Sequence, residues 1–352
     1  MAANLATTNG SAAMFSGSGI VPWHEFGVVI QGRANAAEAL ALAGLDWQVG
    51  KSPIFYNGND AGAIFSPISI PDQYVTRRND KVGQESILGI VGERYVVVQN
   101  EDCFGFFDSV IDKNEAIYES AGALGKGERV WILAKLPDQI TLKNDPIDKY
   151  ILLATSHDGS LNLTAKLVAT RVVCQNTLRA ALREDGESIR IRHTSTAQDR
   201  IAMAAAVMGL ANKKFEETQK MYGALMGIKF NALMLDYYLI CCMPSSGDNP
   251  TRASHMRDEV RELIEGKGIG SMLESAKGTA WGLYNGITEY VSRGTGVKEN
   301  TSKLDALWFG SGAKLSGRAF ETALTLPNVS ESVMKAMVDQ ERTKAVAWEN
   351  RQ

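Results

Sequence analysis

Short apolar runs separated by turn-forming residues dominate the first half of the chain. Runs rich in β-branched and aromatic residues, bounded by Gly, Pro, Asn and Asp, are typical of strands. We predict strands over residues 46–56, 63–70, 73–78, 86–91, 94–99, 130–136, 150–156 and 164–173, with an acidic loop over residues 137–148. A short helix over residues 35–43, closed by Gly44, and a helix that begins at Asn100 interrupt this series. Residues 63–99 therefore read as an antiparallel β-meander followed by a packed helix.

From Asp199 onward the apolar residues recur at helical spacing instead. We predict helices over residues 200–226, 230–243, 252–267 and 279–292 and within residues 304–324, followed by a helical or frayed end after Ser330. In the fourth helix Trp281, Tyr284 and Tyr290 share one face, which favours packing in the core over a base-stacking platform. The expected fold class is α+β, with an antiparallel β-meander or sheet and packed helices in the N-terminal half and a helical C-terminal half.

The same pattern divides the chain into four parts. Residues 1–19 are rich in Ala, Ser, Asn and Gly and are expected to form a disordered arm. Residues 20–198 form the expected α+β sheet domain, residues 199–330 a helical region packed on it, and residues 331–352 a tail.

The composition is that of a globular protein rather than a disordered or membrane protein. Of the 352 residues, 45% are hydrophobic and 22% are charged. No apolar run reaches the ~20 residues that span a bilayer, and the N-terminal residues lack the basic and apolar regions of a signal peptide. Cys103, Cys174, Cys241 and Cys242 show no metal-ligand spacing. We therefore expect a protein of a reducing cytoplasm, with no membrane partner.

Charge is distributed unevenly along the chain. The net charge is −3, but residues 160–214 hold nine Lys or Arg against four Asp or Glu, a local charge of +5 that leaves −8 for the remainder. A local basic surface is typical of a protein whose partner carries phosphate, although a run of charges is also common on a simple solvated face.

Residues 164–179 concentrate this basic character at one predicted turn. A buried strand ends near residue 173, Asn176 and Thr177 are good N-cap residues, and an alternating apolar and basic run follows from Leu178. A strand that turns directly into a helix would bring backbone N–H groups, Arg171 and Arg179 into one small volume that suits an anion such as a nucleic-acid phosphate. The alternative is that Cys174 lies in the core and that the residues after it only cap the helix.

The predicted nucleic-acid contacts extend from this turn along the basic segment and into the meander. Arg77 and Arg78 precede the turn at residues 79–83, so we expect both side chains to be exposed. The full set of predicted contacts is Arg77, Arg78, Lys166, Arg171, Gln175, Asn176, Arg179, Arg183, Arg190, Arg192, Lys213 and Lys214.

No sequence motif indicates catalysis, a metal site or a cofactor. There is no Gly-x-Gly-x-x-Gly fingerprint, no phosphate loop, no His-Glu-x-x-His and no Gly-x-Ser-x-Gly. His157 and Asp158 are suited to a metal or to acid–base chemistry, but no third ligand follows at a useful spacing, so we expect a turn capped by Asp158. An enzyme with an unrecognised site at His24, His157 or His193 is a further alternative.

Several segments resemble the phage- and plasmid-like proteins of domain-of-unknown-function family 932. These segments are residues 22–27 (Pro-Trp-His-Glu-Phe-Gly), 39–47, 88–100, 120–123, 157–160, 170–177 (Thr-Arg-Val-Val-Cys-Gln-Asn-Thr) and 308–312. The resemblance extends from Trp23 to about Leu324, and residues 170–177 are its most specific part. It implies a phage, prophage or plasmid origin, and it implies no activity because the function of the family is unknown.

The meander and its helix, residues 73–111, are similar in outline to the β-β-β-α core of Rad52-like strand-annealing proteins. With the local positive charge, this favours a non-enzymatic recombination or replication protein that holds single-stranded DNA by its phosphates and leaves the bases free to pair. Annealing proteins of this kind form rings or filaments, so the resemblance implies a homo-oligomer. The alternative is a non-enzymatic interaction or assembly protein of the mobile element, such as a host-defence antagonist.

Overall fold

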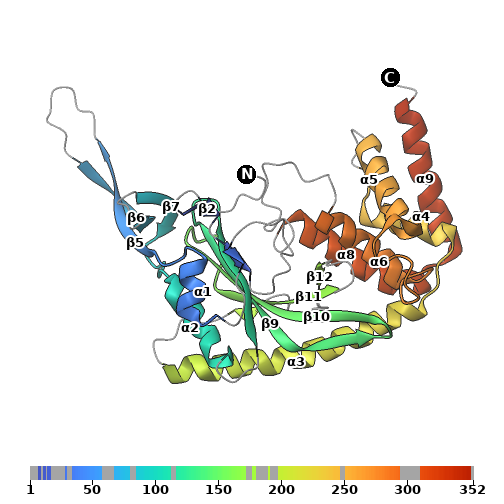
Figure 1. Cartoon of the computed structure of the whole chain (residues 1–352). Helices are drawn as coiled ribbons and strands as arrows, with labels where there is room; N and C mark the ends of the chain where they lie inside the picture. The colour runs from blue at the N-terminus through green and yellow to red at the C-terminus, as the bar shows by residue number, and fades with distance from the viewer. Residues whose placement is uncertain are drawn as a thin grey trace.

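Two larger sheets, antiparallel except for one pair of short strands at residues 14–16 and 28–29, a two-stranded sheet and a set of packed helices form the fold (Figure 1). The computed structural model describes residues 7–8, 11–12, 14–16, 28–29, 34–57, 67–79, 85–111, 116–171, 177–179, 189–190, 197–245, 250–293 and 310–349. Sheets lie in the N-terminal half and helices make up the C-terminal half, so the predicted α+β class is confirmed.

A three-stranded sheet, called here the small sheet, consists of β5 (Gln48–Asn57), β6 (Pro67–Asn79) and β7 (Glu85–Gly92) in that order. The two strands that we predict over residues 63–70 and 73–78 are one long strand, β6. Its irregularity at Asp72, which has a φ of 57°, is a bulge within the strand rather than a break. The predicted strand over residues 94–99 is wrong, because the chain turns after β7, with Tyr95 N donating to Gly92 O.

The helices that flank the small sheet form where the sequence predicts them. Helix α1 (Ala36–Leu42) begins with a capping box in which the Asn35 side chain accepts from Glu38 N, and Gly44 ends it at a φ of 62°. Helix α2 (Asn100–Ile111) follows the small sheet, as expected.

The second sheet, called here the main sheet, has the strand order β12-β11-β10-β9-β8-β3-β4, with β13 also paired to β11. Its strands are β3 (Met14–Ser16), β4 (Val28–Val29), β8 (Ile117–Leu124), β9 (Arg129–Leu142), β10 (Asp145–Ser156), β11 (Thr164–Arg171), β12 (Thr177–Arg179) and β13 (Ile189–Arg190). The predicted acidic loop over residues 137–148 is wrong, because β9 and β10 continue through it to a tight turn at Lys143. Ile140, Leu142 and Ile147 are buried there and hold the hairpin on the core.

Residues 177–179 form a strand and not the first turn of the predicted helix. Thr177, Leu178 and Arg179 pair with Thr170, Ala169 and Val168 of β11. Pairing with a neighbouring strand therefore overrides the local N-cap signal of Asn176 and Thr177.

The described residues of the predicted disordered arm also lie in strands. Strands β1 (Thr7–Thr8) and β2 (Ser11–Ala12) pair with each other, and β3 pairs with β8 of the main sheet. This differs from the disorder that composition predicts for residues 1–19.

The helical half packs on the main sheet. Its elements are α3 (Ala197–Gly227), α4 (Ala232–Cys242), α5 (Pro250–Glu262), the π-helical turn η1 (Leu263–Lys267), α6 (Ala280–Arg293), α8 (Ser311–Thr325), the 3-10 turn η2 (Leu326–Asn328) and α9 (Glu331–Glu349). Helix α3 runs along the main sheet (Figure 1), and one cluster of buried side chains continues from the strands into α3, α4, α6 and α8. None of the described helices is long and apolar enough to cross a membrane.

The aromatic stripe of α6 lies in this core, as expected. Trp281 and Tyr284 are fully buried, and their rings lie 4.8 and 6.2 Å from the ring of Tyr222 on α3. Phe320 of α8 packs edge-on to the same tyrosine. The stripe therefore joins three helices and presents no ring for stacking on a base.

The C-terminal segment is a packed helix held by a shielded ion pair. Met334 of α9 is buried, and Arg257 Nη1 of α5 donates to Glu341 Oε1 of α9 at 2.8 Å, with side chains 13% and 10% exposed. Burial alone would raise the pKa of Glu341, but the hydroxyl of Ser245 and the guanidinium of Arg257 hold it below its usual value. The predicted tail is thus an integral helix at these residues.

Removal of this ion pair should weaken the attachment of α9. We expect Arg257→Ala to lower the free energy of unfolding by roughly 2–3 kcal/mol, because it removes the charged hydrogen bond to the shielded Glu341 carboxylate and leaves only the half-exposed Lys344, 3.5 Å away, as its cation. Denaturant unfolding followed by circular dichroism measures the change. Arg342→Ala is the matched control, since that side chain is 70% exposed and should shift stability by less than ~0.5 kcal/mol. Equal losses of unfolding free energy in the two variants would mean that the Arg257–Glu341 ion pair does not stabilise the attachment of α9.

Candidate nucleic-acid interface

Strand pairing brings three of the predicted cations to positions of one face at an edge of the main sheet. Lys166 lies on β11, and Arg179 on β12 and Arg190 on β13 pair with β11 at Val168 and Thr164. Lys166 is therefore two residues away from the partner position of each of these arginines. Diagonal neighbours on paired strands lie about 7–8 Å apart. We call Lys166, Arg179 and Arg190 the basic edge. Arg171, also on β11, pairs with Ile147 and occupies a position of the opposite face, so it is not part of this group.

Lysines 213 and 214 do not belong to the basic edge. Lys166 pairs with Leu152 of β10, whose side chain lies on the opposite face of the main sheet from Ile151. Helix α3 packs on the Ile151 face, so Lys213 and Lys214 lie on the other side of the sheet. Lys214 is also paired with Glu217 at 2.8 Å. The segment of charge +5 thus does not form a single basic track.

Arg78 is buried, which corrects the expectation of an exposed side chain. It is 2% exposed, its guanidinium lies 4.7 Å from the centre of the Trp47 ring, and its Nη1 donates to Lys126 O at 2.9 Å. Arg77 is half-buried on the opposite face of the small sheet, where its Nε donates to Ser52 Oγ. Strand alternation explains the difference, because neighbours in one strand point to opposite faces.

Four predicted contacts lie outside the described residues. They are Gln175, Asn176, Arg183 and Arg192. Three more of the twelve predicted contacts, Arg171, Arg179 and Arg190, are located by the strand pairing of their backbone alone.

A polar cluster that the sequence did not single out crosses the main sheet beside the basic edge. Asp148 accepts from Lys135 Nζ at 2.8 Å, from Gln139 Nε2 at 2.7 Å and from Tyr150 OH at 3.3 Å. Burial raises the pKa of Tyr150, and the carboxylates of Glu119 and Asp148 raise it further, so this phenol stays protonated. Lys135 keeps 30% of its side chain exposed, and its charge is balanced by Asp148. Leu133 and Lys135 are two residues apart in β9, and this spacing is the sequence signal that places both on one face.

His157 is a buried structural residue rather than a catalytic base. Its Nε2 lies 3.0 Å from Asn100 Oδ1, and because Asn100 Nδ2 donates to Leu45 O, that oxygen is the acceptor and Nε2 carries the proton. Burial lowers the pKa of His157 to about 4, opposed by the nearby Asp158 carboxylate. Asp158 Oδ1 accepts from Ser160 N at 2.8 Å, so the predicted capped turn is confirmed.

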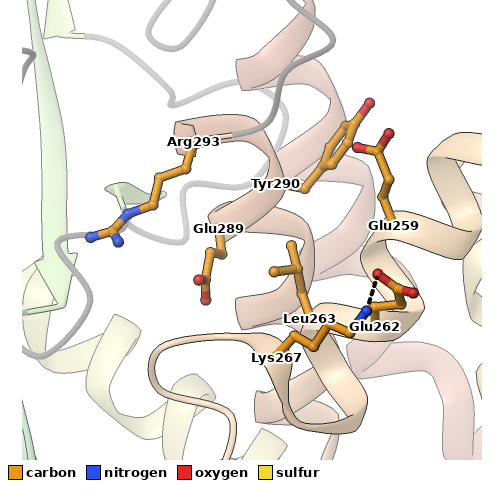
Figure 2. Close-up of a pocket in the computed structure, with 7 residues that line it drawn as sticks. All are labelled: Glu259, Glu262, Leu263, Lys267, Glu289, Tyr290 and Arg293. Atoms are coloured by element: carbon orange, nitrogen blue, oxygen red, sulfur yellow. Dashed lines mark ion pairs between the residues drawn. The ribbon is translucent and has the colours of Figure 1, made fainter.

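A pocket of about 230 Å³ lies between α5, η1 and α6 (Figure 2). It is lined by Glu259, Glu262, Leu263, Lys267, Glu289, Tyr290 and Arg293. Lys267 is paired with Glu262 at 2.9 Å, and Glu289, which is 6% exposed, accepts from Ile269 N at 3.0 Å. The lining holds three carboxylates against two cations, a net charge of −1 that does not attract phosphate, so the pocket is not an extension of the basic edge. Among the described residues, no group of three or more His, Cys, Asp or Glu is placed to hold a metal ion.

Comparison with known proteins places most of this architecture in one family. The model of the family described as "Domain of unknown function (DUF932)" matches residues 87–308, well over half of the chain. The chain belongs to this family. No curated protein and no solved structure matches it. In this DUF932 protein the matched range includes the basic edge, whereas Arg77 and Arg78 precede it.

Proposed function

We propose that this DUF932 protein binds single-stranded DNA along the basic edge and promotes the annealing of complementary strands. In this proposal it is a non-enzymatic accessory of recombination or replication in a phage or other mobile element, acts in the host-cell cytoplasm, and needs no cofactor. The alternative, a non-enzymatic interaction or assembly protein of the element, predicts no affinity for DNA.

The backbone register of the basic edge carries the proposal. Lys166, Arg179 and Arg190 occupy three hydrogen-bonded strands at positions of one face, opposite or within the segment Thr164 to Val168 of β11. Cations at such spacing are suited to successive phosphates of a flexible single strand, which binds through its backbone and leaves its bases accessible.

The small sheet agrees only in part with the expected β-β-β-α outline. Residues 73–111 contain the end of β6, then β7 and α2, because residues 94–99 form no strand; three strands precede α2 only when β5 is included. The proposal therefore rests on the basic edge and not on this outline.

A salt titration tests the proposal directly. We expect a labelled single-stranded oligonucleotide to bind at ~50 mM salt and to lose affinity steeply as salt rises, because binding releases counterions. The double variant Arg179→Ala/Arg190→Ala should bind more weakly whatever the sequence, and its salt slope should fall by about two, one for each phosphate contact. Fluorescence anisotropy measures both quantities.

A matched control separates the basic edge from general positive charge. Lys220→Ala/Lys314→Ala removes the same charge from exposed positions on α3 and α8 and should leave the salt slope unchanged. Failure of the wild-type protein to bind at low salt would contradict DNA binding altogether. Binding that is equally reduced in both double variants would remove the basic edge from the interface. Acceleration of annealing between complementary oligonucleotides tests the second half of the proposal.

A further inference from the structure

A β-bulge turns two isoleucines of the small sheet toward solvent. The register of β6 and β7 shifts between Thr76 and Arg77, so that Leu88 is the extra residue of β7. Without this shift Ile87 and Ile90 would point to opposite faces, because side chains alternate along a strand. With it, both face away from the core and are 62% and 63% exposed, while Leu88 is buried.

The same face continues along β5 and β6 onto a projecting arm. Ser52 of β5 pairs with Val75, which pairs with Ile90 of β7. Alternation along β5 then places Tyr56 on this face, together with its cross-strand partner Ile68. These two side chains are 52% and 45% exposed. Figure 1 shows that the β5–β6 arm extends beyond the rest of the molecule, so the face is accessible. We call it the outer face.

The size of the outer face fits an interface rather than ordinary surface. The four side chains Ile87, Ile90, Tyr56 and Ile68 are about half exposed and contribute roughly 100 Å² each, so the outer face exposes on the order of 400 Å² of apolar area, the size of the largest and often functional patch on a monomer. If two copies bury this area against each other, the apolar part alone is on the order of 800 Å², and the polar rim brings the total above about 1,000 Å², where specific interfaces begin. Of the described residues on the outer face, Arg77 alone is cationic, so the face does not suit a nucleic acid.

We propose that the outer faces of two copies of this chain pack against each other across a two-fold axis. A two-fold axis brings the same surface of each copy together, so Ile87, Ile90 and Tyr56 of one copy cover those of the other. The two small sheets then stack about 10 Å apart, as sheets do in a β-sandwich. This dimer does not rest on DNA binding, because the basic edge belongs to the main sheet.

The mass of the protein in solution, measured by light scattering without nucleic acid, tests the interface. The wild-type chain of 38.2 kDa should form a dimer or an assembly built from dimers. Ile87→Lys/Ile90→Lys should reduce that mass to the monomer, or by half in a larger assembly, because it places four ammonium groups in the contact. Tyr56→Lys should also weaken the dimer, which raises its dissociation constant.

Two controls distinguish the outer face from exposed apolar surface in general. Phe55→Lys changes a side chain that is 54% exposed on the other face of the same arm, and Val333→Lys changes one that is 54% exposed on α9. Both should keep the wild-type mass. Thermal unfolding of Ile87→Lys/Ile90→Lys as a diluted monomer should match that of the diluted wild type. A wild-type monomer at every concentration, as expected if a different protein covers this face, would overturn the proposal, as would an unchanged mass in Ile87→Lys/Ile90→Lys.

Discussion

Trp281→Ala is expected to lower the free energy of unfolding by roughly 3–5 kcal/mol, the usual cost of removing a fully buried tryptophan. The indole contacts Tyr222 and Tyr284, and its Nε1 donates to Asp145 Oδ2 at 3.1 Å. Asp145 is fully buried, so loss of a donor to its carboxylate adds to the loss of packing. Urea unfolding followed by circular dichroism measures the change.

Two further variants separate the parts of this effect. Trp281→Phe keeps most of the ring but removes the N–H, so it should cost roughly 1.5–3 kcal/mol, the range for a hydrogen bond to a charged group. Val346→Ala removes apolar atoms from a side chain that is 56% exposed and should stay within ~0.5 kcal/mol. A Trp281→Ala protein as stable as the wild type would mean that α6 does not hold the core together.

Acid should destabilise the protein through His157, which the fold keeps neutral. The pKa of His157 is lowered from 6.5 to about 4 in the folded protein. As the pH falls below 6.5 the unfolded chain takes up a proton that the folded protein does not bind. The stability present above pH 6.5 is therefore lost as the pH falls toward 4. The difference between the pKa of 6.5 in the unfolded chain and about 4 in the folded protein corresponds to a loss of about 3 kcal/mol in unfolding free energy.

Unfolding free energies at several pH values between 7 and 4 isolate this contribution. His157→Gln keeps an amide donor toward Asn100 but does not titrate. Between pH 7 and pH 4 the wild type should therefore lose about 3 kcal/mol more unfolding free energy than this variant. His255→Gln is the control, because that side chain is exposed and its curve should run parallel to the wild type. Parallel curves for His157→Gln and the wild type would contradict a buried neutral imidazole.

Elements whose local chemistry and tertiary packing agree were predictable from the sequence. Asn35 caps α1 and Gly44 ends it, so both boundaries follow from side-chain and backbone chemistry alone. The aromatic spacing of α6 likewise placed Trp281 and Tyr284 in the core.

Elements that depend on distant partners were not predictable. Strand β8 reads Ile-Tyr-Glu-Ser-Ala-Gly-Ala-Leu, with small residues in place of β-branched ones, and is a strand because β9 and β3 pair with it. Strand β12 carries N-cap residues and pairs with β11 instead. A single-residue bulge at Leu88 decides which face Ile87 occupies, and no local signal marks it.

The candidate site was only partly predictable for the same reason. Sequence spacing identified a basic segment but not the strand pairing that sets Lys166 beside Arg179 and Arg190 and leaves Lys213 on the other side of the sheet. The burial of Arg78 follows from its contact with Trp47, which lies far away in the sequence.

Helix α3 has a mechanical consequence for the whole molecule. Its 31 residues extend about 46 Å at 1.5 Å per residue. It packs on α2 near one end of the molecule, on β9 along the way, and on α6 and α8 toward the other end. A continuous helix anchored at several points is stiff, so among the described residues α3 offers no hinge between the elements it contacts. We therefore expect α2, β9, α6 and α8 to move together with α3, and not as two lobes that close on each other.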